Sequence, residues 1–118
     1  MAGLVPAIHE NVAVGSIGRQ GNPMEGAWVY IVTNRPNGTL YTGVTSDIAK
    51  RAWEHREGVA EGFTKRYGLK RLVYVGEHPD IQRAIQREHN MRHWPRKWKV
   101  RLILAANTNW DDLYDRLA

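Results

Sequence analysis

The runs Trp28-Val-Tyr-Ile-Val-Thr33, Asn34-Arg-Pro-Asn-Gly38 and Thr39-Leu-Tyr-Thr-Gly-Val44 decide the fold of this chain. The first and third runs are rich in β-branched and aromatic residues, which favour strands, and the middle run consists of turn formers. We therefore expect a β-hairpin. Pro36 suits the first central position of a type I turn, and Gly38 closes that turn.

The loop of this hairpin determines which side chains lie opposite one another. A loop flanked by residues 34 and 39 places Tyr41 opposite Val32. It also places Tyr30 opposite Gly43. The two tyrosines then share one face of the hairpin as diagonal neighbours, about 7–8 Å apart at Cα.

Helix and strand signals alternate after the hairpin. Thr45-Ser-Asp47 offers N-cap residues for a helix that stops at Gly58, and Pro79-Asp80 starts a later helix. The expected elements are a helix to about 57, a short helical or irregular piece within 62–68, a strand over 72–75, a helix over about 80–94, a helix ending near 107 and a short turn around 110–114. The order β-β-α-β-α-α predicts a small α+β domain.

The overall composition limits the class of protein. The chain has 118 residues, a net charge of +5, a pI near 9.8 and no cysteine. This length suits one domain. The lack of cysteine excludes a disulfide scaffold, a thiolate zinc site and a cysteine nucleophile. The excess of basic side chains suits a polyanionic partner.

The sequence carries no apolar stretch that approaches the roughly 20 residues needed to span a bilayer. A charged segment followed by an apolar one, as in a signal peptide, is also missing. We therefore expect a cytoplasmic protein with no membrane partner. Residues 1–25 are rich in glycine and proline, so we expect a tail outside the core and one domain over 26–114.

A carboxylate interrupts the apolar stripe of the second long helix. Glu88 lies in the middle of this stripe, where burial is costly unless a cation or a hydrogen-bond donor compensates. The apolar members of the stripe are Ile81, Ala84, Ile85 and Met91. Two interpretations remain open: a structural ion pair, for example with Arg92 at i+4, or a ligand for a divalent cation such as Mg²⁺, which takes oxygen ligands, water and substrate phosphate.

Arg51 and His55 lie one turn apart on the first helix, next to the two tyrosines of the hairpin. Taken singly, they fit an ordinary surface arginine and a satisfied interface histidine. Taken together, the four side chains supply a planar cation for a phosphate, a titratable imidazole and two phenols. Cleavage of a phosphodiester requires such groups together with a metal on the leaving side.

The order of these residues resembles the GIY-YIG nuclease domain. Trp28-Val-Tyr30 is followed after ten residues by Tyr41-Thr-Gly43, then by Arg51, eight residues after the glycine, and by Glu88 on a later helix. The similarity is greatest to small stand-alone bacterial GIY-YIG proteins and covers about residues 26–114. It implies a three-stranded antiparallel sheet flanked by helices and divalent-metal-dependent cleavage of DNA.

The resemblance also implies roles for single residues. Tyr30 and Tyr41 correspond to the two motif tyrosines, and either Tyr30 or His55 activates the attacking water. Arg51 clamps the scissile phosphate. Glu88 holds a single Mg²⁺ or Mn²⁺ near the leaving 3′ oxygen.

Two further positions follow from the resemblance. Gly43 lies at the start of the active-site loop, where a side chain would crowd the phosphate. Asn107 matches a polar residue that members of the family place near the site.

The segment from Arg87 to Arg101 carries the positive charge of the chain, with six cations against Glu88. With Trp94 and Trp98 interleaved, it is typical of a strip that contacts a nucleic-acid backbone and stacks on bases. In the opposite interpretation, which we favour for the tryptophans, both rings belong to the core. The candidate phosphate contacts in this strip are Arg92, Arg96 and Lys97.

Three hypotheses follow for function. The leading one is a divalent-metal-dependent endonuclease that hydrolyses phosphodiester bonds in DNA. The second is a non-catalytic nucleic-acid-binding module with the same fold. The third is a purely structural α+β domain in which Glu88 belongs to a salt bridge.

Overall fold

The computed structural model describes residues 26–60 and 62–117, so the expected tail over 1–25 lies outside the described residues. The element order confirms the predicted α+β arrangement β-β-α-β-α-α, with one additional short helix after the first long one. The elements are β1 (Ala27–Thr33), β2 (Leu40–Thr45), α3 (Ile48–Arg56), α4 (Phe63–Tyr67), β3 (Arg71–His78), α5 (Ile81–Arg92), α6 (Arg96–Ala106) and the 3-10 helix η3 (Leu113–Arg116).

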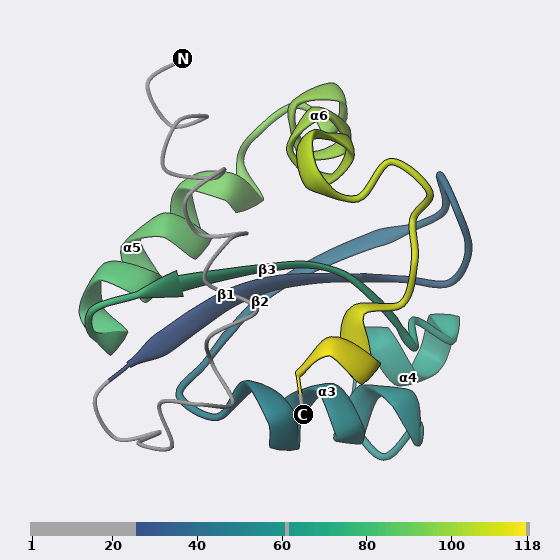
Figure 1. Ribbon diagram of the computed structural model, residues 1–118, viewed down its shortest axis with the longest axis horizontal. Coiled ribbons are helices and arrows are strands. Elements are labelled where there is room, and N and C mark those ends of the chain that lie inside the picture. The colour runs from purple at the N-terminus through teal and green to yellow at the C-terminus, as the bar shows by residue number, and fades with distance from the viewer. Residues whose placement is uncertain (1–25, 61, 118) are drawn as a thin grey trace.

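The three strands form one antiparallel sheet in the order β2-β1-β3 (Figure 1). The central strand β1 is buried along its whole length. Tyr30 pairs with Gly43 and Val32 pairs with Tyr41, so the predicted register is confirmed. β2 forms one edge of the sheet, and this edge carries the site described below.

The turn of the hairpin differs from the expected type I. The Gly38 amide donates to the Arg35 carbonyl at 2.9 Å, so Pro36 and Asn37 are the central residues. Asn37 has φ 57°, and a positive φ at the second central position belongs to a type II turn. Asparagine tolerates this left-handed conformation better than most residues, which makes the alternative turn accessible.

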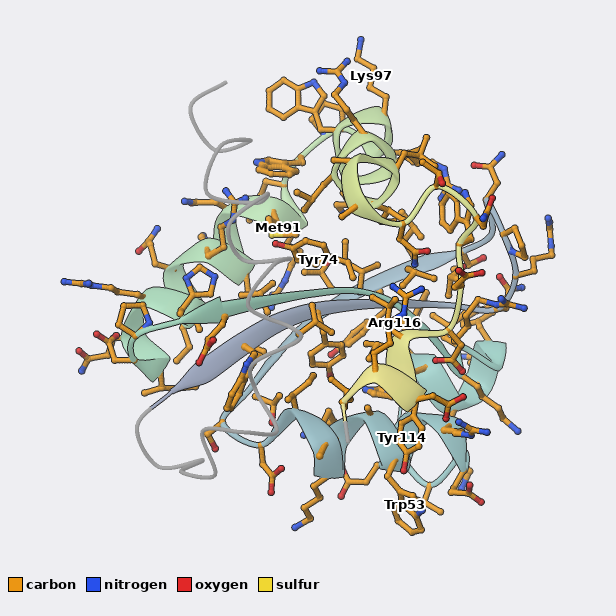
Figure 2. The ribbon with its side chains drawn as sticks, in the orientation of Figure 1. Trp53, Tyr74, Met91, Lys97, Tyr114 and Arg116 are labelled. Carbon is orange, nitrogen blue, oxygen red and sulfur yellow. The ribbon has the colours of Figure 1, made fainter. Side chains whose placement is uncertain are left out.

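Helices cover both faces of the sheet (Figure 1). α5 and α6 pack on one face, where Tyr74 and Met91 fill the space between sheet and helices (Figure 2). α3 and η3 pack on the other face, against residues that include Tyr30 and Ile48. Leu117 is also buried on this face, so the packed core extends beyond residue 114. Because successive residues of a strand point to opposite faces, Tyr30 and Tyr41 both belong to the α3 face.

Capping residues set where α3 and α5, the two helices that carry Arg51 and Glu88, begin. The Asp47 carboxylate accepts from the Lys50 amide at the start of α3, as the sequence predicts. Asp80 accepts from the Arg83 amide in the same way at the start of α5. These caps fix the registers that bring Arg51, on α3, and Glu88, on α5, to the same edge of the sheet. Within the described part of the chain, none of the helices has both the length and the apolar character needed to cross a bilayer.

Candidate active site

A pocket of about 280 Å³ lies at the edge strand β2, where elements from both faces of the sheet meet. β1, β2 and α3 contribute side chains from one face, and α5 reaches the same pocket from the other. Its lining includes all five residues expected to be catalytic: Tyr30, Tyr41, Arg51, His55 and Glu88. Gly43 and Arg92 also line it. The pocket therefore contains all the residues that were predicted to be catalytic from their chemistry and from the family resemblance.

Tyr30 and His55 form a hydrogen-bonded pair at the base of the pocket. The Tyr30 hydroxyl lies 2.9 Å from His55 Nε2, and both side chains are buried. Burial, followed by the nearby positive charge of Arg51, lowers the pKa of His55 to about 4. Burial also raises the pKa of the Tyr30 hydroxyl above its ordinary value, and the neighbouring Tyr41 adds to this effect. At neutral pH the pair therefore consists of a neutral imidazole and a protonated phenol.

Gly43 is required by the position of the Tyr30 ring. A Cβ atom at residue 43 would lie 2.4 Å from both Cζ and the hydroxyl oxygen of Tyr30. These distances are far inside normal contact, and both atoms belong to a buried ring. We expected glycine at position 43 because a side chain would crowd the phosphate. The structure gives a more direct reason, since a side chain here would first displace the Tyr30 ring.

Arg51 and Tyr41 form the more open part of the pocket. Arg51 Nη1 lies 3.1 Å from Glu54 Oε1, and the arginine side chain remains partly exposed. This ion pair, one turn along α3, holds the guanidinium at the pocket without burying it. The Tyr41 ring lies 6.2 Å from the His55 ring, centroid to centroid. Tyr41 is half-buried and so presents a phenol to the solvent side.

Glu88 lies at the margin of the buried face of α5 and not at its middle. Ala84 and Met91 are buried on that face, whereas Ile81 and Ile85 are exposed, so the apolar stripe is narrower than predicted. Glu88 itself is only 4% exposed. Its position at the margin lets its carboxylate enter the pocket around the edge of β2.

Arg92 pairs with this buried carboxylate. Its Nε donates to Glu88 Oε2 at 2.9 Å, and its Nη2 donates to the same oxygen. The hydrogen bond and the charge of Glu88 raise the pKa of Arg92. The ion pair expected at i+4 is therefore present, and it engages one carboxylate oxygen, leaving Oε1 outside the pair.

Comparison with known proteins addresses the family directly. The model of the GIY-YIG catalytic domain matches residues 26–101. The chain belongs to the GIY-YIG family. This match includes every residue that lines the pocket.

Small bacterial proteins of this family are similar over most of the chain. The UPF0213 protein SSP2268 of Staphylococcus saprophyticus is 34% identical over 80 residues, which cover 68% of this chain and 96% of that protein. The UPF0213 protein SA0446 of Staphylococcus aureus strain N315 has the same identity and coverage. The solution NMR structure of the UPF0213 protein BH0048 from Bacillus halodurans is 28% identical, covers 74% of this chain and 92% of that chain, and has a TM-score of 0.47. The chain is thus a homologue of the bacterial UPF0213 proteins.

Asn107, which was expected near the site of this GIY-YIG domain, does not line the pocket, and neither do Arg96 and Lys97, which were expected to contact phosphate along the basic strip. Asn107 is buried, and its amide nitrogen donates to the carbonyls of Val73 and Asp111, so it ties the C-terminal loop to β3. Arg96 donates to the Gly38 carbonyl at 2.7 Å and holds the hairpin turn. Lys97 projects from the outer end of α6, away from the sheet (Figure 2).

The two tryptophans of the basic segment take an intermediate position. Trp94 is half-buried and packs against the core, with its ring 5.9 Å from that of Trp98 in an edge-to-face arrangement. Trp98 is also half-buried. The guanidinium of Arg87 lies 4.9 Å from the centre of the Trp94 ring. The preference for fully core tryptophans is therefore only partly met.

Sequence reasoning did not select two pocket residues on the short helix α4. Phe63 and Thr64 both line the pocket, and the Phe63 ring stacks on that of Tyr41 at 6.2 Å. The only signal in the sequence was a phenylalanine directly after Gly62, in a short segment bounded by two glycines. The structure adds that Gly62 has φ 91° and that Phe63 is exposed. Phe63 and the adjacent Tyr67 are exposed together, and contiguous exposed apolar side chains beside a pocket mark a candidate contact surface.

Proposed function

We propose that this chain is a divalent-metal-dependent endonuclease that hydrolyses phosphodiester bonds of DNA in the pocket at β2. The observation that carries the proposal is the convergence of a hydrogen-bonded Tyr30–His55 pair, the Arg51 cation and the Glu88 carboxylate in one concave site. Membership of the family of GIY-YIG catalytic domains supports a nuclease as the reaction class. The basic segment of α5 and α6 supports a nucleic acid as the substrate.

The residues present fit one hard divalent cation. Glu88 offers a buried carboxylate with one oxygen outside its ion pair. The described residues contain no cluster of three or more histidine, cysteine, aspartate or glutamate side chains, so most of the shell would consist of water and substrate phosphate, as Mg²⁺ prefers. Bound at Glu88, Mg²⁺ or Mn²⁺ would supply positive charge for the leaving 3′ oxygen.

The Tyr30–His55 pair provides the path for a proton. The attacking water transfers a proton to the Tyr30 oxygen while the Tyr30 proton passes to His55 Nε2, so the histidine is the final acceptor. The low pKa of His55 keeps the imidazole unprotonated at neutral pH, which leaves it able to accept the proton but makes it a weak base. The imidazolium then releases this proton to solvent, which restores the pair. The new bond joins the water oxygen to phosphorus, the bond from phosphorus to the 3′ oxygen breaks, and solvent protonates the leaving oxygen.

Two arginines flank the position of the scissile phosphate. Arg51 is held by Glu54 with its guanidinium at the pocket. Arg92 lies beside Glu88 and is exposed toward the same space. A planar guanidinium binds two phosphate oxygens at once, which suits the negative charge that the non-bridging oxygens carry during attack.

The test is cleavage of supercoiled and single-stranded DNA in Mg²⁺ or Mn²⁺, comparing the wild type with Glu88→Ala and Arg51→Ala. We expect metal-dependent cutting by the wild type and a loss of about 10²–10³-fold or more in each variant. Lys70→Ala, at an exposed lysine outside the pocket, is the control with unchanged cutting. Cutting that survives in both site variants would refute the assignment.

A non-catalytic nucleic-acid-binding module is the second candidate. The Glu88–Arg92 ion pair favours it, because such a pair also satisfies a buried carboxylate without any metal. The same experiment separates the two functions. Salt-dependent DNA binding with no cutting in any divalent metal would establish the module.

A further inference from the structure

A second cavity of about 510 Å³ adjoins the active-site pocket along the edge strand β2. The two cavities share Tyr41, Phe63 and Arg92. The second one extends from these residues toward the hairpin turn, past Thr42 and Leu40. With a rise of about 3.3 Å per strand residue, the distance along β2 from Gly43 to Leu40 is about 10 Å. The two cavities thus form one continuous groove.

The wall formed by α4 is aromatic and open to solvent. Phe63 is 46% exposed although it is a large apolar side chain. The plane of the Phe63 ring is inclined by only 26° to that of the Tyr41 ring. The centroid of the Tyr67 ring lies 4.6 Å from that of Phe63. An exposed ring backed by further rings is a platform for the flat face of a nucleobase.

The opposite wall is cationic. Lys99, on α6, lines the second cavity with Arg92. Partial burial, followed by the charges of Arg96 and Arg92, lowers the pKa of Lys99. Three cations thus lie close together on this side, while Glu88 is the carboxylate that acts on Lys99 in the other direction. A bound phosphate would offset their mutual repulsion.

Thr42 adds a polar group between these walls. Its side chain lines the cavity and is mostly buried, and its hydroxyl has no hydrogen-bond partner among the described residues. Buried hydroxyl groups normally have a partner. The hydroxyl oxygen is itself buried, so the fit to a ligand with both a ring and a charge rests on the aromatic and the cationic wall.

We propose that this second cavity is a nucleotide subsite, in which a base of the substrate strand stacks on Phe63 and the phosphate attached to it binds Lys99. The proposal rests on the proposed function, because this nucleotide lies in the part of the groove next to the scissile phosphate at Glu88. It names Phe63 and Lys99 as binding residues that fix where the strand lies in the pocket. Neither residue takes part in the proton path.

The first test measures binding without cleavage. Glu88→Gln protein is titrated with a fluorescent single-stranded decanucleotide, in which every base is accessible, and with copies that carry one abasic position each. We expect one abasic position to weaken binding about 5- to 100-fold. We expect the same loss from Phe63→Ala, and no additional loss when the two changes are combined. Equal losses at every abasic position in both proteins would overturn the subsite.

Matched variants separate stacking from general effects. Trp53 is 47% exposed, lies on the outer side of α3 and lines neither cavity, so Trp53→Ala keeps full affinity (Figure 2). Phe63→Trp restores binding, because the larger ring still stacks. Circular dichroism checks that each variant is folded. Loss of affinity in Trp53→Ala equal to that in Phe63→Ala would contradict a specific platform.

The phosphate contact has its own measurement. Lys99→Gln is expected to reduce the slope of log affinity against log salt by about 0.7, whereas Lys70→Gln leaves it unchanged. An unchanged slope in Lys99→Gln would overturn this contact. If the wild type cuts no DNA in any metal but Phe63→Ala removes the abasic effect, the subsite stands and the nuclease proposal fails. Robust cutting with no effect of Phe63 on binding gives the reverse result.

Discussion

The ring of Tyr30 lies over the backbone of Gly43, its partner on the neighbouring strand, so closely that no other residue fits at position 43. Tyr30 comes from the buried central strand and Gly43 from the edge strand. The absence of a side chain at position 43 thus leaves the space that the Tyr30 ring occupies. The two motifs that contain these residues act as one unit through this contact.

Gly43→Ala tests this contact. We expect the unfolding free energy to fall by about 1–3 kcal/mol, because the added Cβ forces the Tyr30 ring out of place. A shift of about 1 Å in a reacting group lowers activity by about 10²-fold. Gly26→Ala is the control, since its Cβ would meet no atom closer than 3.6 Å. Urea unfolding and a DNA cleavage assay measure both effects, and equal stability of the two variants would contradict the packing argument.

Tyr30→Phe removes one oxygen atom from the proton path. Cleavage is expected to slow by about 10²–10⁴-fold, as for loss of a positioned acid-base group. The change also leaves the buried His55 Nε2 without its hydrogen-bond partner, which lowers the unfolding free energy by about 1–3 kcal/mol. Tyr114→Phe is the comparison, since Tyr114 lies on η3, outside the pocket. Single-turnover cleavage near the wild-type rate in Tyr30→Phe would exclude the relay.

His55 gives the fold a pH dependence of known sign. Its pKa is about 4 in the folded protein, against about 6.5 in an unfolded chain, so only the unfolded chain takes up the proton between these values. The unfolding free energy therefore falls as pH drops from 6.5 to 4, by about 3 kcal/mol at most, and His55 contributes no slope above this range. His55→Gln loses that slope, while His89→Gln, at an exposed position, keeps it. Urea titrations across this range decide, and parallel profiles for the wild type and His55→Gln would show that the imidazole is not buried neutral.

Arg92→Ala separates the ion pair from the metal site. Without Arg92, the buried Glu88 carboxylate loses its ion pair and both hydrogen bonds from the guanidinium, so the melting temperature in EDTA falls below that of the wild type. The rise in melting temperature on adding Mn²⁺ becomes larger than in the wild type, because the ion no longer competes with the guanidinium. Arg83→Ala, which removes an exposed pair with Asp80, leaves the Mn²⁺ response unchanged. A Mn²⁺ response that persists in Glu88→Gln would place the ion elsewhere.

Asn107→Ala tests the structural role found for this residue. It removes the hydrogen bonds from its amide to Val73 and Asp111 and the bond that its oxygen accepts from the Asp111 amide. We expect a loss of about 2–3 kcal/mol in unfolding free energy. Cleavage per folded molecule stays within about twofold of the wild type. Asn109→Ala, two residues further along and exposed, shows neither effect. A lower cleavage rate in Asn107→Ala without loss of stability would instead support a role of Asn107 in the site.

The hairpin and its register follow from the sequence because they depend on neighbouring residues. The loop length alone sets Tyr30 opposite Gly43, and the caps at Asp47 and Asp80 start their helices at the predicted residues. The predicted turn type was wrong because it depends on the φ of a single residue, Asn37, which can adopt either a negative or a positive value.

The site was predictable in its residue types but not in its boundaries. Glu88 stands out in an apolar stripe, yet the sequence does not reveal that Ile81 and Ile85 face solvent, because this depends on how α5 crosses the edge of the sheet. Asn107 and Arg96 were assigned to the substrate by their type and position. Their polar groups instead bond to backbone carbonyls brought near by tertiary packing, which no local pattern contains.

The position of Tyr30 on the central strand has a consequence for how the molecule can vary. Backbone amides of a buried strand that is paired on both sides exchange with solvent only when the whole domain opens. Phe63 instead lies in a helix of five residues between two glycines with positive φ. The Tyr30 hydroxyl, to which we assign the proton transfer, is thus held by the slowly opening framework of the sheet, while the Phe63 ring, to which we assign base stacking, lies on a short surface helix. If both assignments hold, substitutions in α4 change the binding of nucleic acid without moving Tyr30.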